Sequence, residues 1–271
     1  MIACLAASSL LLALSSLQKP GASKPWEATD VPQPEEIVVG GDEHMRYLLH
    51  VPDKDAKEPA DGWRVLVVMP GGDGSADFAP FVGRIRQNAL GKEWVLVQLV
   101  APKWDDKQGE KNVWPTEKRP WPGMKFSTEK FLDAVLDDFA KRRKIDAKFV
   151  YTLTWSSSGT TAYALALEPK TRITGSFIAM SVFRKEELPP LKNGTGRRFY
   201  ILHSPQDEVC LIKFAEQARE ELTKAGAEVE YKTYEGGHGW HGDVYGEIKT
   251  GIEWLASGAK PKKDPKAKPG K

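Results

Sequence analysis

The chain has 271 residues, of which 41% are hydrophobic and 28% charged, and its formal net charge is +2. This length and composition suit one large α/β domain or two small ones, and they exclude a fibrous or broadly disordered protein. Residues 259–271 carry a formal charge of +5, so the remainder, at about −3, is not a basic nucleic-acid binder.

The amino-terminal residues 1–22 are predicted to be a signal peptide, because the apolar stretch from Ile2 to Leu17 resembles a secretory h-region. A basic n-region is missing, so a wrongly assigned start or a membrane anchor are the alternatives. The stretch is short for a membrane-spanning helix. We therefore expect a secreted or periplasmic protein without stable membrane insertion.

The remaining boundaries follow from composition. The proline-rich residues 23–35 read as a linker, residues 36–257 as the folded domain, and residues 258–271 as a basic, disordered tail. A tail that binds an anionic envelope polymer is the alternative. Cys4 would leave with the signal peptide, so Cys210 would have no partner for an intramolecular disulfide.

Eight segments have the pattern of β-strands. The first two are joined by a Gly-Gly-Asp turn and predict an antiparallel entry hairpin, while several of the later ones are almost continuously apolar, as strands covered on both faces must be. In chain order they are Glu36 to Val39, Met45 to Val51, Arg64 to Met69, Trp94 to Val100, Phe149 to Thr154, Gly175 to Met180, Phe199 to His203 and Val229 to Tyr234. Amphipathic helical patterns fall between most of them, which predicts an α/β fold: a mainly parallel sheet with helices on both faces.

The strand from Phe149 stops at three serines and is followed by a helix-forming segment, which predicts a sharp corner that exposes a serine beside a helix amino terminus. In the usual G-x-S-x-G form of this corner both flanking positions are glycine. Here Thr154 and Ser158 occupy them, and Gly159 follows one place late. A hydroxyl that only caps the helix is the alternative. Among the serines we favour Ser156, because choosing Ser157 would place the Trp155 indole at the crowded first glycine position.

Three more loops follow strands that should end at the same edge of the sheet. Residues 69–75 form a glycine cluster whose amides could approach a ligand, or an ordinary turn. Asp207 could orient a histidine or cap the next helix. His238 stands between glycines that free it to project, although a loop histidine is usually a surface residue. Serine, aspartate and histidine in this order, with a glycine-rich loop upstream, indicate a serine hydrolase.

The stretches that carry these residues are Ile145 to Tyr151, Trp155 to Gly159, His203 to Val209 and Tyr234 to Trp240. They resemble the corresponding segments of small esterases of the α/β-hydrolase superfamily, of the polyhydroxybutyrate-depolymerase, feruloyl-esterase and phospholipase/carboxylesterase types. The resemblance spans about residues 36 to 256.

The resemblance implies the α/β-hydrolase fold with Ser156 as nucleophile, His238 as base and Asp207 as the orienting acid. It also implies that the amides of Gly72 and Ser157 form an oxyanion hole. Three residues depart from the pattern: Thr154 and Ser158 replace the glycines, and Pro70 stands where a histidine often precedes the oxyanion glycine. His241 is the weaker candidate base, because it lies near the start of the last helix.

The segment from Ala101 to Phe126 has no clear periodicity and contains Trp104, Trp114 and Trp121. An irregular loop of this length is uncommon unless it forms a lid or a binding wall, so we expect these tryptophans to contact substrate. Cover for the domain's own core is the alternative. Trp155 and Trp240, which adjoin the predicted triad residues, are also candidate substrate-binding residues.

We therefore expect a serine esterase that acts on a small-molecule or polymer-linked carboxylic ester, without a metal or other cofactor. Two alternatives stay open. One is a non-catalytic protein of the same fold that binds a glycan or another ligand through the tryptophan-rich loop, and the other is a serine peptidase of the same superfamily. No nucleic-acid partner is expected, and the sequence does not predict the oligomeric state.

Overall fold

The structure is a computed structural model that describes residues 31–52, 56–108 and 112–258. The predicted signal peptide, most of the linker and nearly all of the basic tail lie outside these ranges, as does Cys4. Within the described ranges no helix combines the length and apolar character that crossing a membrane requires.

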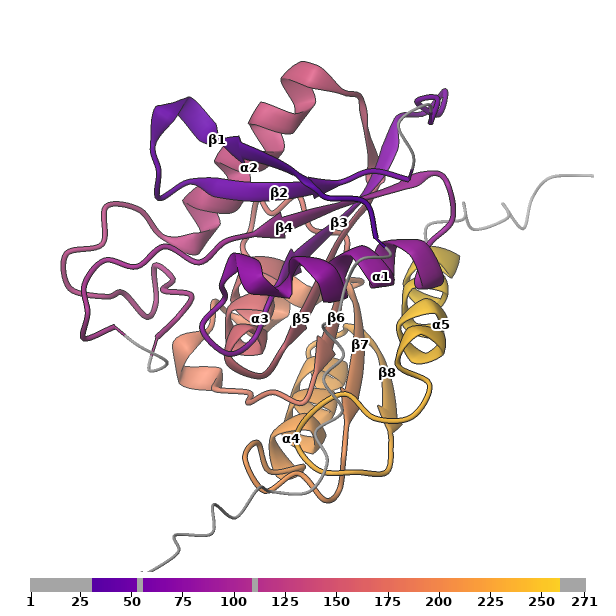
Figure 1. The fold of residues 1–271 in the computed structure, drawn as a ribbon. Helices are drawn as coiled ribbons and strands as arrows, with labels where there is room; N and C mark the ends of the chain where they lie inside the picture. The colour runs from indigo at the N-terminus through magenta and orange to yellow at the C-terminus, as the bar shows by residue number, and fades with distance from the viewer. Residues whose placement is uncertain (1–30, 53–55, 109–111, 259–271) are drawn as a thin grey trace, which may run out of the picture.

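The described residues form an eight-stranded sheet in the order β1-β2-β4-β3-β5-β6-β7-β8 (Figure 1). The strands are β1 (Glu35–Val38), β2 (Arg46–His50), β3 (Trp63–Met69), β4 (Trp94–Leu99), β5 (Ile145–Trp155), β6 (Gly175–Ala179), β7 (Arg198–His203) and β8 (Glu228–Thr233). The β1–β2 and β2–β4 pairs are antiparallel and all other pairs are parallel. The predicted entry hairpin and the mainly parallel sheet are therefore confirmed.

Helices cover both faces of the sheet (Figure 1). On one face lie α1 (Ala79–Ala89) and α5 (Val244–Ser257), whose apolar side chains pack into one core. On the other lie α2 (Thr128–Arg142), α3 (Gly159–Leu167) and α4 (Lys213–Lys224), which share a second core. Since a sheet buried on both faces needs apolar residues at successive positions, the continuous apolar runs in the sequence are explained.

Strand β5 carries two threonines into this interior, and the hydroxyl groups of both are hydrogen-bonded. Tyr151, Leu153 and Trp155 belong to the core under α1 and α5, so Thr152 and Thr154 point to the opposite face. The hydroxyl of Thr152 donates to Ser176 Oγ at 2.9 Å, and that of Thr154 donates to the Phe177 carbonyl at 3.3 Å. These bonds offset the cost of burying two hydroxyl groups.

The carboxyl ends of the parallel strands lie at one edge of the sheet. The loops after β3, β5, β7 and β8 hold the glycine cluster and the predicted serine, aspartate and histidine. The loop after β4 runs from Ala101 to Phe126, and its described part contains no helix or strand, as the sequence predicted. A mainly parallel sheet places ligand sites at this edge.

Candidate active site

The chain turns sharply between β5 and α3. Ser156 has a φ of 54°, in the left-handed region that a non-glycine residue rarely adopts, and it begins a single 3₁₀ turn that leads into α3 at Gly159. Such a conformation costs about 1–3 kcal/mol and persists only where the surroundings enforce it. The strain falls on Ser156 rather than on Ser157, which agrees with the register that the sequence favoured.

Two neighbouring residues explain how the corner forms without its usual glycines. Ser158 is fully buried, and its hydroxyl lies 2.7 Å from the Met69 carbonyl oxygen and 3.0 Å from that of Trp155, while it accepts the Trp155 amide at 3.1 Å. The side chain therefore braces β5 against β3. Glycine is needed one place later, because a Cβ at Gly159 would lie 2.1 Å from Ser181 Oγ.

Three side chains from three loops meet at this corner. Ser156 Oγ lies 2.9 Å from His238 Nε2, and His238 Nδ1 lies 2.9 Å from Asp207 Oδ2. The structure thus brings together the three residues that the sequence proposed as a triad. A histidine whose Nδ1–H donates to a carboxylate keeps Nε2 free to accept the serine proton.

Asp207 is 3% exposed and uses both carboxylate oxygens. Oδ1 accepts the amides of Val209 and Cys210 at 2.9 and 2.8 Å, whereas Oδ2 faces His238. The helix cap that the sequence offered as the alternative is wrong, because α4 begins at Lys213 and its N-cap is Ile212; Asp207 Oδ1 instead closes the turn that precedes this helix. Each bond to the charged form stabilises the carboxylate in a site that excludes water.

His203, the last residue of β7, lies next to Asp207. The sequence analysis did not identify it as a functional residue. Its Nε2 donates to the Cys210 carbonyl at 2.5 Å and lies 3.5 Å from Asp207 Oδ2. The ring is 1% exposed, and burial lowers the pKa of His203, which favours the neutral ring. The sequence feature that could have identified His203 is its position as a polar residue at the end of an apolar strand, four residues before Asp207.

The loop that carries His238 is fixed to the Asp207 loop. Gly236 accepts the Ser204 hydroxyl at its carbonyl and donates its amide to Gln206 Oε1 at 3.2 Å. The Tyr234 hydroxyl donates to the Gly239 carbonyl at 2.8 Å. Gly236 and Gly239 have φ values of 128° and 137°, so the two glycines supply the conformations that let the loop turn His238 towards Ser156.

The glycine loop after β3 lies against the serine corner. The Ser157 hydroxyl donates to the Gly72 carbonyl at 2.9 Å. In the described part of the chain the Gly72 amide makes no hydrogen bond, and the amide of Ser157, in the first turn of a helical segment, has no acceptor within that segment. These are the two amides that the sequence proposed as an oxyanion hole.

Three of the five candidate substrate-binding tryptophans pack into the protein. Trp155 is 5% exposed and meets Phe81 and Trp240 with ring centroids 5.7 and 5.8 Å away, so Trp155 and the half-buried Trp240 belong to one aromatic cluster. Trp114 is 1% exposed and donates its indole N–H to the Pro70 carbonyl at 3.0 Å. For Trp114 the alternative of core cover describes the geometry better, because its ring supports the glycine loop.

The other two tryptophans are half-buried on the outer part of the same loop. Trp104 stacks on His44 with ring centroids 5.0 Å apart, and the indole N–H of Trp121 donates to Asp105 Oδ2 at 3.0 Å. Both retain exposed surface that a ligand could cover.

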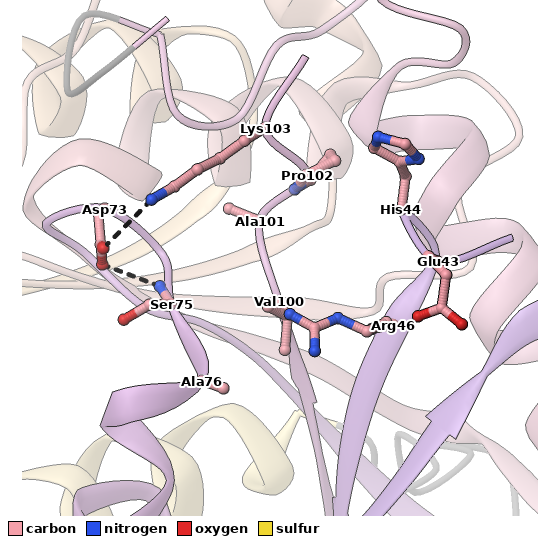
Figure 2. Close-up of a pocket in the computed structure, with 10 residues that line it drawn as sticks. All are labelled: Glu43, His44, Arg46, Asp73, Ser75, Ala76, Val100, Ala101, Pro102 and Lys103. Carbon is pink, nitrogen blue, oxygen red and sulfur yellow. Dashed lines mark hydrogen bonds and ion pairs between the residues drawn. The ribbon is translucent and has the colours of Figure 1, made fainter. Parts of the chain in front are cut away.

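A cavity of about 250 Å³ opens beside the glycine loop, and Figure 2 shows its lining. Lys103 Nζ lies 3.9 Å from Asp73 Oδ2, and Asp73 Oδ1 accepts the Ser75 amide at 3.0 Å. The Arg46 side chain of this lining is paired with Glu36 at 2.7 Å. The cavity is not lined by Ser156, Asp207 or His238, so it is distinct from the place where these three side chains meet.

One group of possible metal ligands occurs among the described residues, and it coincides with the triad. Ligand atoms of Asp207, Cys210 and His238 lie within 4.8 Å of one another. However, Asp207 and His238 are hydrogen-bonded to each other, and burial raises the pKa of the Cys210 thiol to about 11. A protonated thiol is a poor metal ligand, so the donor set does not fit a metal site.

No protein-family model matches the chain, and no curated protein matches its sequence. Solved structures do match. The Bacillus cereus carboxylesterase is 18% identical, with a TM-score of 0.57 over 78% of this chain and 93% of that one. The propionate-bound esterase 2 of the planctomycete Thermogutta terrifontis is 16% identical, with a TM-score of 0.60 over 83% of this chain and 94% of that one.

A third match is MGS-M1, described as an alpha/beta hydrolase enzyme from a deep-sea metagenome library of the Medee basin. It is 15% identical, with a TM-score of 0.61 over 85% of this chain and 99% of that one. Identities this low speak to the fold. The strand order, the strained serine corner and these neighbours agree, and the chain has the α/β-hydrolase fold.

Proposed function

We propose that the protein is a serine hydrolase that cleaves carboxylic esters through an acyl-enzyme. The observation that carries the proposal is the unbroken chain of hydrogen bonds from Ser156 through His238 to Asp207, with both distances 2.9 Å. His238 Nε2 takes the Ser156 proton as Oγ attacks the ester carbonyl, and Asp207 stabilises the imidazolium. The same histidine then protonates the departing alcohol.

The second half of the reaction uses the same groups. Water, deprotonated by His238, attacks the acyl carbon, and Ser156 leaves with the returned proton. In both halves the amides of Gly72 and Ser157 stabilise the negative oxygen. The bond from the Ser157 hydroxyl to the Gly72 carbonyl supports this assignment, because it holds the two segments at a fixed separation.

The neighbours support an ester substrate and suggest a probe. Esterase 2 of Thermogutta terrifontis is described as phosphorylated by paraoxon. We propose that Ser156 likewise reacts with organophosphorus reagents, because a strained, histidine-activated serine attacks phosphorus as it attacks a carbonyl carbon. We also propose that the amino-terminal segment 1–22 exports the protein.

The test is hydrolysis of p-nitrophenyl esters of increasing acyl length, with methyl ferulate and acetylated xylan measured beside them. Ser156→Ala should lower the turnover rate to about a thousandth of the wild-type rate or less. Ser257→Ala, at the end of α5, is the matched serine control and should keep most of it. A fluorophosphonate adduct should map to Ser156. A folded protein that neither turns over an ester nor accepts the probe would favour the ligand-binding alternative.

A further inference from the structure

Two large apolar side chains stand out on the described surface. Val209 is 69% exposed and Leu211 is 45% exposed, and they are the exposed large hydrophobic residues of the described chain. They flank Cys210, which is 7% exposed, on the segment between β7 and α4. Single exposed apolar residues are ordinary, but these two lie two positions apart on one segment, and together they offer an apolar contact surface.

The segment that presents them is built into the catalytic network. The amides of Val209 and Cys210 donate to Asp207 Oδ1 at 2.9 and 2.8 Å, and the Cys210 carbonyl accepts from the buried His203 ring. The backbone is therefore held from both sides while the Val209 and Leu211 side chains face outwards. Their exposure results from a fixed geometry next to the triad acid.

The sheet order decides which part of an ester reaches this segment. Ser156 follows β5, the Gly72 loop follows the neighbouring β3 on one side, and the Asp207 and His238 loops follow β7 and β8 on the other. The carbonyl oxygen must point to the Gly72 side. The departing alcohol must lie against His238, which protonates it. The alcohol part of the substrate is thus directed towards the β7 and β8 loops.

We propose that Val209 and Leu211 form a binding site for the alcohol part of the substrate, and that the preferred substrates are esters of apolar alcohols. The inference rests on the proposed esterase function. Covering two exposed apolar side chains with an alkyl group removes apolar surface of both partners from water, which favours binding. A charged or strongly hydrated alcohol gains nothing from this contact.

The experiment varies the alcohol while the acyl group stays constant. Hydrolysis of methyl, butyl and octyl acetate is followed by release of acid, and kcat/KM should rise with alkyl length by about tenfold from methyl to octyl. Val209→Ser with Leu211→Ser should flatten this series by lowering kcat/KM for octyl acetate, and should leave methyl acetate turnover and the melting temperature nearly unchanged, because a methyl group is too small to cover either side chain. Leu191→Ser, a partly buried position in the segment before β7, is the control and should keep the slope.

A second series varies the acyl group at constant alcohol, using p-nitrophenyl acetate, butyrate and octanoate. The double variant should give the wild-type profile here. Loss of acyl-length dependence with an intact alcohol series would place the site on the acyl side and overturn the assignment. Two unchanged series would remove the site while leaving the esterase, whereas no turnover of any ester would remove the proposed function and this site together.

Discussion

Gly159 lies so close to Ser181 that position 159 has no room for a side chain. A Cβ there would lie 2.1 Å from Ser181 Oγ and 2.3 Å from Ser181 Cβ, and the Ser181 hydroxyl donates to the Ser156 carbonyl at 2.6 Å. Gly159→Ala should therefore displace the Ser156 turn and lower ester turnover at least tenfold. Adding Ser181→Gly should restore part of it. If Gly159→Ala keeps full activity, the turn is more adaptable than its contacts indicate.

His203 is expected to act through Asp207 and the Cys210 carbonyl rather than on the substrate. His203→Leu leaves a buried carbonyl without a donor, a change that costs about 1–3 kcal/mol. We expect kcat to fall about tenfold or more with KM nearly constant, because the acid loop then holds His238 less well. His203→Gln keeps a donor and should recover most of the rate. A loss of melting temperature with kcat unchanged would reduce the residue to a structural role.

The loop from Ala101 to Phe126 divides into an inner part that packs and an outer part that is free to bind. Trp114→Ala should lower the free energy of unfolding by about 3–5 kcal/mol, since it removes a fully buried indole from under the glycine loop. Trp121→Ala should cost about 1 kcal/mol or less. It should also weaken turnover of a bulky ester more than that of p-nitrophenyl acetate, as measured by kcat/KM. If Trp121→Ala affects both esters equally, the outer part of the loop also only covers the core and does not bind substrate.

For the whole molecule, stability should fall in mild acid because burial lowers the pKa of two histidines, His203 and His50, and the contribution of His50 can be tested alone. His50 is 4% exposed, its Nε2 lies 3.3 Å from Gln98 Oε1, and burial lowers the pKa of His50 from 6.5 to about 4. As the pH falls from 6.5 to 4, His50 becomes protonated in the unfolded chain but stays neutral in the folded chain. Stability that is complete above pH 6.5 is therefore lost over this window, by about 3 kcal/mol.

Urea unfolding at pH 7.5 and pH 4.5 measures this loss. His50→Gln should lose about 2–3 kcal/mol less than the wild type between the two values, because glutamine does not titrate. Comparing the two proteins cancels the contribution of the carboxylates, which both contain. An identical loss in both would show that another group controls acid stability.

The sheet could be predicted from the sequence because each apolar run matches a strand buried on both faces, as in β3 and β4. The triad could be predicted because its members directly follow strands that end at one edge. What the sequence left open depends on contacts between distant segments. Two examples are the hydrogen bond from Ser158 to the Met69 carbonyl and the hydrogen bond from Trp114 to the Pro70 carbonyl, which join residues far apart in the chain. The exposure of Val209 likewise depends on how the whole chain folds. Periodicity describes only local neighbours.

Helix α3 is buried at all nine of its positions, from Gly159 to Leu167, and it starts directly after the 3₁₀ turn that Ser156 begins. We therefore expect its amide protons to exchange with solvent mainly through unfolding of the whole domain. The 235–242 loop, which is half-buried or exposed throughout, should open locally and exchange much faster. Hydrogen-exchange mass spectrometry should thus find slow exchange in a peptide spanning 159–167 and fast exchange in one spanning 235–242. Equal exchange rates in the two peptides would contradict this. Ser156 would then lie next to the slowest-exchanging segment of the protein, whereas the loop that carries His238 could move away and return without unfolding of the whole domain.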